Sequence, residues 1–302
     1  MAISIDDVYV NTYEKNVRFL AQQGISRARP WCMERAVHSE AHNWERIAKS
    51  AAALKATADV GGAATATPNG QTVWSRRQSV PVAYAVGDLT ETDQIVQMIV
   101  DPNSAYAQSH GMAMRRAIDT EILAKAAGVS KTGAGVDVPF RTAGDIPVGT
   151  YDQQVGDGST AITYDIVTQV TETFLLNDID PSERKVFFIS PAQQRKLLQL
   201  TEATSRDFTE MGQLRNGYVD SWMGYTWVVS TLLPEGSLGA GTNYCIAMTE
   251  KAMGLQMNRD VTANIAQDPS ASFAWRIYCE SVFGAIRVED EHLVRVDVTN
   301  TI

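Results

Sequence analysis

Two histidines spaced four residues apart are the first pattern in this 302-residue sequence that could do chemistry. His38 and His42 stand in the run HSEAH, and on a helix both would point toward one zinc ion. Zinc hydrolases of this type need a glutamate directly after the first histidine, but Glu40 comes two residues after it and would face away. His110 and His292 are the other two histidines that could add a ligand. An amphipathic surface helix is the simpler interpretation.

Other catalytic patterns are equally incomplete. The run AAGVSKTGAG resembles a phosphate-binding loop, but Ser130 stands where a glycine must precede Lys131. The sequence contains no G-x-S-x-G elbow, and no cysteine has a neighbouring histidine to activate it. The EDE run at Glu289 to Glu291 is better interpreted as an exposed turn between two strands than as an acid-base pair. The sequence therefore predicts no catalytic, cofactor-binding or metal-binding residues.

Composition and charge narrow the class of protein. Hydrophobic residues make up 44% of the chain and charged residues 20%, which suffices for one large or two smaller cores. No apolar run approaches the roughly 18 residues of a membrane span, and the N-terminus lacks the pattern of a signal peptide, so we expect a cytosolic protein. The net charge of −9 argues against a main role in gripping nucleic acid. The cysteines Cys32, Cys245 and Cys279 are too few and too far apart for a disulfide framework.

A long helix over 102–127 is the best-defined predicted element. Asp101 is a good N-cap, Pro102 stands at the first helical position, and Gly128 predicts a left-handed stop. Apolar residues recur at helical spacing along one stripe: Ala107, Gly111, Met114, Ile118 and Ile122. At 1.5 Å per residue this helix would be about 39 Å long.

The remaining elements predict an α+β protein with a β-rich end. Helical spacing in YDIVTQVTETFLLNDIDP is followed by the buried strand KVFFIS and then by a helix that Ser190 caps. Later strands are predicted at GYTWVVS, NYCIAMT, GLQMN, SFAWRIYCESVF and HLVRVDV. Nearer the N-terminus, the stretch from Glu40 to Lys49 has a helix-compatible pattern and its element type stays open. Asp88 and Glu91 have capping-box spacing and predict a short helix.

A stretch of small residues separates two parts that both look ordered. Loops usually hold about four to six residues, but Gly61 to Pro68 has no apolar period and leads into the strand-like run WSRRQSVPVAYAV. Composition alone favours a disordered surface loop. The tryptophan and the arginine pair instead favour an ordered hairpin that docks on another molecule.

Three segments in order carry a resemblance to a known family. SEAHNWERI comes before the small-residue stretch, YAVGDLTETDQIVQMIVDPNSAYAQSHGMAMRRAIDTEI after it, and KVFFISPAQQRKLLQLTEATSRDF later. In this order they resemble the major capsid proteins of tailed bacteriophages with the Hong Kong 97-like fold. The resemblance covers most of the chain and is most specific from Tyr84 to Ile122.

The resemblance implies an α+β fold with five segments. They are an N-terminal arm at 1–48, an E-loop hairpin at 49–87, a peripheral domain at 88–160 with the spine helix 102–127, an axial domain at 161–259, and a β-rich return to the peripheral domain at 260–302. Because a hairpin without its own core is marginally stable alone, the E-loop is expected to lie on another subunit. The candidate residues for this subunit interface are Trp74, Arg76, Arg77 and Tyr84.

The same resemblance implies a function. It implies a major capsid protein that self-assembles into the icosahedral head shell around the double-stranded DNA genome of a tailed phage. The partners would be copies of itself in hexameric and pentameric capsomers, with scaffolding, portal and decoration proteins as further partners and DNA nearby without sequence-specific binding. The implied location is the virion capsid, assembled in the host cytoplasm, with no membrane involved. Two alternatives remain, namely an encapsulin-like cellular shell protein of the same fold and a soluble α+β enzyme.

Overall fold

The computed structural model describes residues 22–47, 74–90, 102–140, 153–200 and 218–301. The chain divides into two compact units. Unit 1 takes its residues from 1–26, 82–118 and 259–282, and unit 2 from 27–81, 119–258 and 283–302. Residues 1–21 of the expected N-terminal arm and the small-residue stretch from Gly61 to Pro68 lie outside the described residues.

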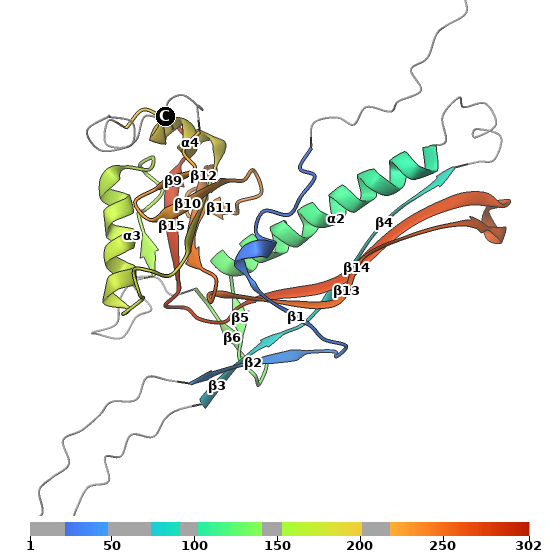
Figure 1. The fold of residues 1–302 in the computed structure, drawn as a ribbon, viewed down its shortest axis with the longest axis horizontal. Coiled ribbons are helices and arrows are strands. Elements are labelled where there is room, and N and C mark those ends of the chain that lie inside the picture. The colour runs from blue at the N-terminus through green and yellow to red at the C-terminus, as the bar shows by residue number, and fades with distance from the viewer. Residues whose placement is uncertain (1–21, 48–73, 91–101, 141–152, 201–217, 302) are drawn as a thin grey trace, which may run out of the picture. The chain divides into compact units, whose positions relative to one another are not determined.

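Unit 1 combines the first part of a long helix with three long strands (Figure 1). The elements that enter it are α2 (Pro102–Ala127), β4 (Val82–Thr90), β13 (Met253–Asp268) and β14 (Ala274–Arg287). The short helix η3 (Pro269–Ala271) joins β13 to β14. β14 lies between β13 and β4 in their sheet, which has the order β1-β13-β14-β4. β4 approaches its neighbour closely, because a Cβ on Gly87 would lie 3.1 Å from the Ile277 carbonyl oxygen.

Unit 2 is built around a seven-stranded sheet of order β7-β15-β12-β8-β10-β9, with β11 paired to β12. The strands are β7 (Gln154–Val155), β8 (Lys185–Ile189), β9 (Ser221–Trp222), β10 (Tyr225–Val229), β11 (Glu235–Gly236), β12 (Gly239–Thr249) and β15 (Leu293–Thr299). The helix α3 (Tyr164–Leu176) packs beside β7 and β15, and α4 (Pro191–Leu197) follows β8 (Figure 1). Trp227 stacks on Phe187 with ring centroids 4.6 Å apart, and both are fully buried. This aromatic pair marks the core of the sheet.

Shorter elements of unit 2 lie around the ends of the long strands. They are η2 (Arg29–Trp31), β1 (Met33–Ala36), β2 (His42–Ile47), β3 (Trp74–Ser79), β5 (Ser130–Lys131) and β6 (Asp137–Val138). β1 runs parallel to the first residues of β13, in register from Met33 opposite Gly254. β2 and β3 form an antiparallel pair, and so do β5 and β6. These two small sheets meet where Arg77 forms a bridge with Thr132.

The local signals predicted most of these elements correctly. The helix at 102–127 is confirmed as α2, although its expected N-cap Asp101 lies outside the described residues. Ser190 caps α4 by accepting a hydrogen bond from the Gln193 backbone N–H at 3.4 Å. The five predicted C-terminal strands are all present, and GLQMN is part of the much longer strand β13. Within the described ranges, no helix is long and apolar enough to span a membrane.

Two expectations are wrong, and one element type that the sequence left open is now known. The stretch after Glu40 contains the strand β2, not a helix, because its backbone pairs with β3. Asp88 lies inside strand β4 and therefore does not start a helix. Gly128 has no left-handed backbone, and glycine is favoured there because a Cβ would lie 2.7 Å from the Ala124 carbonyl oxygen. The seven-stranded sheet joins β7 and β15 to strands from the range 161–259.

Candidate functional site

The hairpin formed by β2 and β3 has two chemically different faces. Alternate side chains of a strand point to opposite sides, and the register places Trp44 opposite Arg77 and Ile47 opposite Trp74. Burial follows this alternation, because Trp44, Arg77 and Ser79 are buried. The inner face is defined here as Trp44, Arg46, Arg77 and Ser79, and the outer face as Glu45, Ile47, Trp74 and Arg76. The inner face attaches the hairpin to its own unit, and the outer face remains exposed.

Trp44 holds the inner face against the start of β13 and the end of β14. It belongs to a small apolar core with Ile286 and Val288, against which Met33 packs. A Cβ on Gly254 would lie 2.6 Å from the Trp44 ring, so the indole occupies space that only glycine leaves open. The tryptophan is therefore a structural anchor of the hairpin.

Ser79 adds a buried polar contact to this anchor. Trp44 Nε1 donates a hydrogen bond to Ser79 Oγ at 3.1 Å, and Ser79 Oγ donates to Gln256 Oε1 at 2.7 Å. Gln256 Nε2 in turn donates to Asn258 Oδ1 at 2.7 Å and to the Ser39 carbonyl oxygen at 3.2 Å. Buried polar groups cost little when their hydrogen bonds are made, so this chain fixes the hairpin against β13.

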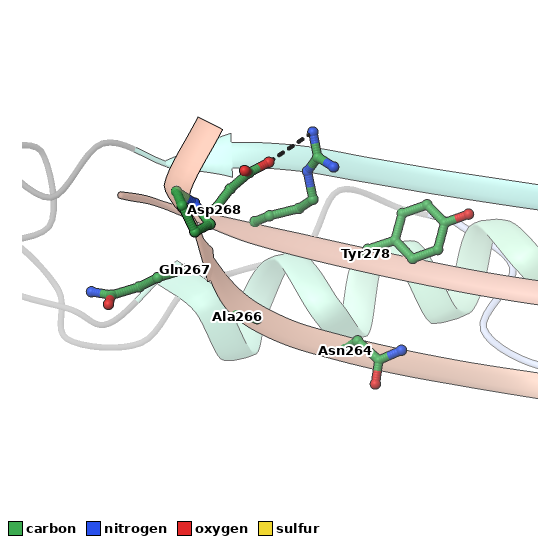
Figure 2. Close-up of a pocket in the computed structure, with 7 residues that line it drawn as sticks. Asn264, Ala266, Gln267, Asp268 and Tyr278 are labelled. Carbon is green, nitrogen blue, oxygen red and sulfur yellow. Dashed lines mark ion pairs between the residues drawn. The ribbon is translucent and has the colours of Figure 1, made fainter. Parts of the chain in front are cut away.

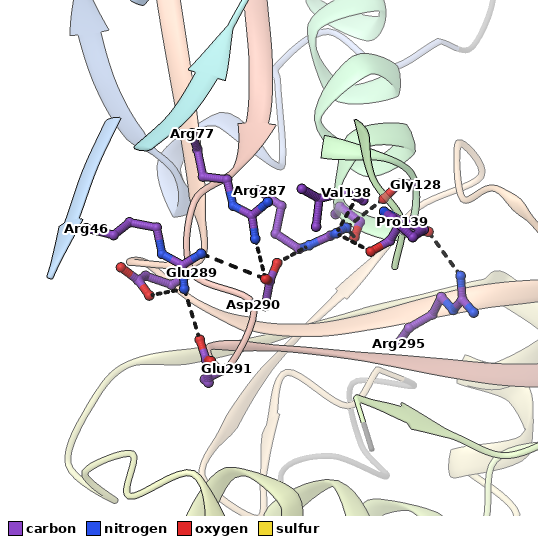
Figure 3. Close-up of polar contacts among 12 residues, drawn as sticks. Arg46, Arg77, Gly128, Val138, Pro139, Arg287, Glu289, Asp290, Glu291 and Arg295 are labelled. Carbon is purple, nitrogen blue, oxygen red and sulfur yellow. Dashed lines mark hydrogen bonds and ion pairs between the residues drawn. The ribbon is translucent and has the colours of Figure 1, made fainter. Parts of the chain in front are cut away.

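A charge-balanced group of side chains completes the inner face (Figure 3). The Asp290 cluster is defined as three arginines and three carboxylates, namely Arg46, Arg77, Arg287, Glu289, Asp290 and Glu291. Arg77 Nη2 lies 2.5 Å from Asp290 Oδ2, and Arg287 Nε lies 2.6 Å from Asp290 Oδ1. The exposed fraction is 6% for Arg77, 1% for Arg287 and 4% for Asp290. Both oxygens of one buried carboxylate are therefore shared between two buried arginines.

Arg46 forms a looser layer of the Asp290 cluster. Its guanidinium nitrogens lie 3.3 Å from Glu289, 3.9 Å from Asp290 and 3.4 Å from Glu291. Figure 3 shows Arg46 reaching all three carboxylates from β2, while Arg77 reaches Asp290 alone from β3. Strand β2 thus contacts the 289–291 turn through one arginine near three carboxylates, and β3 contacts it through one arginine paired with a single carboxylate.

The electrostatic environment shifts the pKa values of two acids in the cluster, Asp290 and Glu289, in opposite directions. Burial raises the pKa of Asp290, but the charges of Arg287 and Arg77 and a hydrogen bond from Arg287 outweigh it, so the pKa lies below its ordinary value. Burial together with Glu291 and Asp290 raises the pKa of Glu289, although Arg46 opposes this. Burial also lowers the pKa of Arg77, against the attraction of Asp290. Asp290 is therefore held ionised as the shared acceptor.

We expect the stabilising effect of Asp290 to disappear in acid. Its folded-state pKa is depressed, so its contribution is fully present above the unfolded value of about 3.9 and is lost as pH falls through the folded value. The free energy of unfolding of the wild-type chain should exceed that of Asp290→Asn by a constant amount above about pH 5 and by less below about pH 4. Urea unfolding at each pH measures this difference. A difference unchanged down to about pH 2 would contradict the assignment.

No local pattern in the sequence predicted this cluster. The EDE run was expected to form an exposed turn, and it does connect β14 to β15, but Asp290 at its centre is buried. The partners that bury it come from a strand 213 residues earlier in the chain and from the end of β14. The arginine pair in WSRRQS is the one signal in these strands that could have pointed to it.

Four residues were predicted to contact another subunit, and they lie in three different environments in the structure. Trp74 is 61% exposed and Ile47, which the sequence reasoning missed, is 58% exposed directly opposite it. Arg76 also lies on the outer face and pairs with Glu45 at 3.3 Å. Arg77 belongs to the inner face. Tyr84 is half-buried in β4 of unit 1.

A pocket lies at the far end of β13 and β14 (Figure 2). It is lined by Asn264, Ala266, Gln267, Asp268, Pro269, Arg276 and Tyr278. Asp268 Oδ1 accepts a hydrogen bond from the Ser270 N–H at 2.9 Å, and Asp268 Oδ2 pairs with Arg276 at 3.1 Å. Ser272 and Phe273 then turn the chain with positive φ angles. The two charged side chains of the pocket pair with each other, which favours a structural turn over a ligand site.

The groups considered for catalysis do not form a site in the described part of the chain. His42 lies in β2 with its ring 4.9 Å from Trp44, and His38 lies in the loop before that strand, so the helical metal pair does not exist. No cluster of three or more potential metal ligands occurs among the described residues. Burial raises the pKa of Cys245 to about 12 and raises that of Cys32 and Cys279 as well. These thiols are therefore protonated and unreactive at neutral pH.

Comparisons with known proteins agree on one family. A family model described as phage capsid protein matches residues 5–300. The structure is similar to the capsid protein of the cyanophage P-SCSP1u, with a TM-score of 0.73 and 15% identity over 100% of this chain and 96% of that chain. It is also similar to the mature capsid of bacteriophage PhiM1, with a TM-score of 0.69 and 15% identity over 98% of this chain and 93% of that chain. A search of curated proteins finds no match.

A third similar structure is the capsid of a native GTA particle, with a TM-score of 0.71 and 12% identity over 97% of this chain and 96% of that chain. Identities this low establish a shared fold, while the family match extends over nearly the whole sequence. The helix α2 and the many strands, among them the long β13 and β14, form a mixed α+β fold that matches these capsid protein structures. The chain therefore belongs to the phage capsid protein family and is a major capsid protein with the Hong Kong 97-like fold that forms a phage head shell.

Proposed function

We propose that this capsid protein ties its shell together by docking the outer face of the β2–β3 hairpin on a neighbouring copy. The observation that supports this proposal most directly is the division of the hairpin into two faces. The inner face uses Trp44, Arg77 and Ser79 for its own unit, while Ile47 and Trp74 stand exposed as a cross-strand apolar pair. Exposed large apolar side chains that adjoin each other mark a contact surface, and tryptophan is enriched among residues that dominate binding energy.

The predicted interface residues take distinct roles in this proposal. Trp74 with Ile47 supplies the apolar centre of the contact, and Arg76 with Glu45 supplies a polar rim, where charged pairs contribute little. Tyr84, in β4, remains a proposed contact of unit 1. Arg77 acts within its own subunit, because its guanidinium is buried against Asp290 and offers little area to a neighbour.

The proposal extends to the segments of the subunit. We propose the arm at 1–48, the E-loop at 49–87, a peripheral domain at 88–160 and 260–302, and an axial domain at 161–259. Within this scheme we extend the axial domain to β7 and β15, since these strands share its sheet. The spine helix is α2.

The proposed partners are further copies of the chain in hexameric and pentameric capsomers. Scaffolding, portal and decoration proteins are the further partners that such a shell would use, and the shell would be assembled in the host cytoplasm around double-stranded DNA. With a net charge of −9, the chain would hold DNA loosely and without sequence-specific contacts. The proposed role is structural and involves no catalysis.

We expect the purified chain to form capsomers or closed shells. The outer face presents apolar surface that is exposed in a single copy and would be buried between copies. Size-exclusion chromatography and negative-stain electron microscopy over a range of protein and salt concentrations measure this assembly. A stable monomer of 33.0 kDa under every condition, including with added candidate scaffold, would contradict the proposal.

A further inference from the structure

We propose that Asp290 is a positioning residue that fixes the direction in which the β2–β3 hairpin leaves its own subunit. It does so by linking the hairpin to the C-terminal end of α2. This inference rests on the proposed docking role of the hairpin, because direction matters only if the outer face must reach a neighbouring copy.

The link consists of three consecutive steps within unit 2. Arg77 on β3 pairs with Asp290 at 2.5 Å, and Asp290 pairs with Arg287 at 2.6 Å. Arg287 Nη1 then donates hydrogen bonds to the carbonyl oxygens of Gly128 at 2.6 Å and Ala126 at 3.3 Å. A cation at the C-terminal end of a helix is favoured, because the last carbonyl groups carry partial negative charge. Figure 3 shows this path from Arg77 to the helix end.

Further contacts hold Arg287 rigidly in this path. Its Nη2 donates to the carbonyl oxygen of Pro139 at 3.3 Å, and its guanidinium lies 5.0 Å from the centre of the Phe140 ring. A planar guanidinium with all of its sides occupied has one orientation. Arg287 therefore holds Asp290 in a fixed position relative to the end of α2. Asp290 in turn holds Arg77, and with it strand β3.

A carboxylate is needed at the centre of the link. Each oxygen of Asp290 accepts a hydrogen bond from one arginine, so the side chain has to accept from two cations at once. An asparagine offers one oxygen and would turn its amide group toward the second guanidinium. Asp290→Asn should therefore keep one of the two contacts at most, with little change in side-chain volume.

The two strands of the hairpin depend on Asp290 to different degrees. β3 has one charged contact with the 289–291 turn, from Arg77 to Asp290, and outside the hairpin it also makes uncharged hydrogen bonds, such as that from the Gly133 N–H to the Arg76 carbonyl oxygen at 2.9 Å. Arg46 on β2 has carboxylates of three successive residues within 4 Å and can exchange one for another. The proposal thus assigns the positioning to Arg77 and Asp290, while Arg46 adds a replaceable attraction.

The test compares Arg77→Met, Asp290→Asn and Arg46→Met with the wild-type chain in its unassembled form. Hydrogen exchange of backbone amides at 42–47 and 74–79 should accelerate roughly ten- to a hundredfold in the first two variants and by less than about threefold in Arg46→Met. Exchange in β8 and β12 should not change. Arg77→Lys, which keeps one charged contact, should restore part of the protection. Lys251→Met, which removes an exposed ion pair with Glu183 elsewhere in unit 2, serves as the control.

The outcomes separate this inference from the proposed function. Unchanged exchange at the hairpin in Arg77→Met, or equal effects of Arg46→Met and Arg77→Met, would overturn the positioning role. If Asp290→Asn does not fold, Arg77→Met still decides, because Asp290 keeps Arg287 as a partner in that variant. Electron microscopy of the same proteins should show uniform shells for wild type and Lys251→Met and irregular or open shells for Arg77→Met. Uniform shells from Arg77→Met would overturn the inference. Failure of the wild type to form shells would overturn the proposed function, and the exchange rates would still decide whether Asp290 positions the hairpin.

Discussion

Replacing residues 48–73 by the dipeptide Asn-Gly should leave a folded subunit that cannot close shells. Ile47 and Trp74 lie opposite each other at the end of the β2–β3 pair, and a two-residue turn of this type joins antiparallel strands without disturbing their register. Every described contact of the inner face is retained, including Arg77 with Asp290 and Ser79 with Gln256. What is lost is the larger part of the proposed E-loop.

Thermal unfolding and microscopy together measure this first effect. The variant should unfold cooperatively within a few degrees of the wild type, and closed particles should be absent. A second variant carries a Gly-Ser segment of unchanged length in place of 48–73. It tests whether shell closure requires the side chains of this segment or only its length. Normal shells from the Asn-Gly variant would show that this segment does not tie copies together, and a failure to fold would show that it belongs to the core of its own subunit.

The second large effect comes from two tryptophans in opposite environments. Trp227→Ala removes a fully buried ring that stacks on Phe187, and should lower the free energy of unfolding by about 3–5 kcal/mol. Trp74→Ala removes an exposed ring and should change the unfolding of the free subunit by less than about 0.5 kcal/mol. It should nevertheless raise the protein concentration needed for assembly by at least about tenfold, since the ring is proposed to be buried between copies.

Urea unfolding of the free subunit and light scattering during assembly distinguish the two variants. The pair acts as its own control, because the same side chain is truncated in both. If Trp74→Ala assembles at the wild-type concentration, the outer face is not a main contact. If it unfolds as readily as Trp227→Ala, the Trp74 ring contributes to the subunit core and not to an interface.

Local chemistry made much of the fold predictable from the sequence. Pro102 and the apolar stripe predicted α2, Ser190 with Gln193 predicted the start of α4, and alternating residues predicted β14 and β15. These signals work because capping and face periodicity involve residues close together in the chain. The family resemblance likewise depended on the order of such segments.

The candidate site was less predictable because its contacts are distant in sequence. The stretch after Glu40 had a helix-compatible pattern, and only pairing with β3 and packing of Trp44 on Gly254 made it a strand. Asp290 looked like part of a solvated acidic run until Arg77 and Arg287 enclosed it. Exposure of Trp74 was anticipated, but the opposite role of its near neighbour Arg77 required the strand register. Tertiary pairing decided each of these cases over local preference.

Cryo-electron microscopy of the assembled particle tests the two-faced hairpin most directly. We expect density from a neighbouring copy packed against Trp74 and Ile47, and Arg77 within hydrogen-bonding distance of Asp290 of the same copy. A particle in which Trp74 faces solvent, or in which Arg77 pairs with a carboxylate of a different copy, would contradict it.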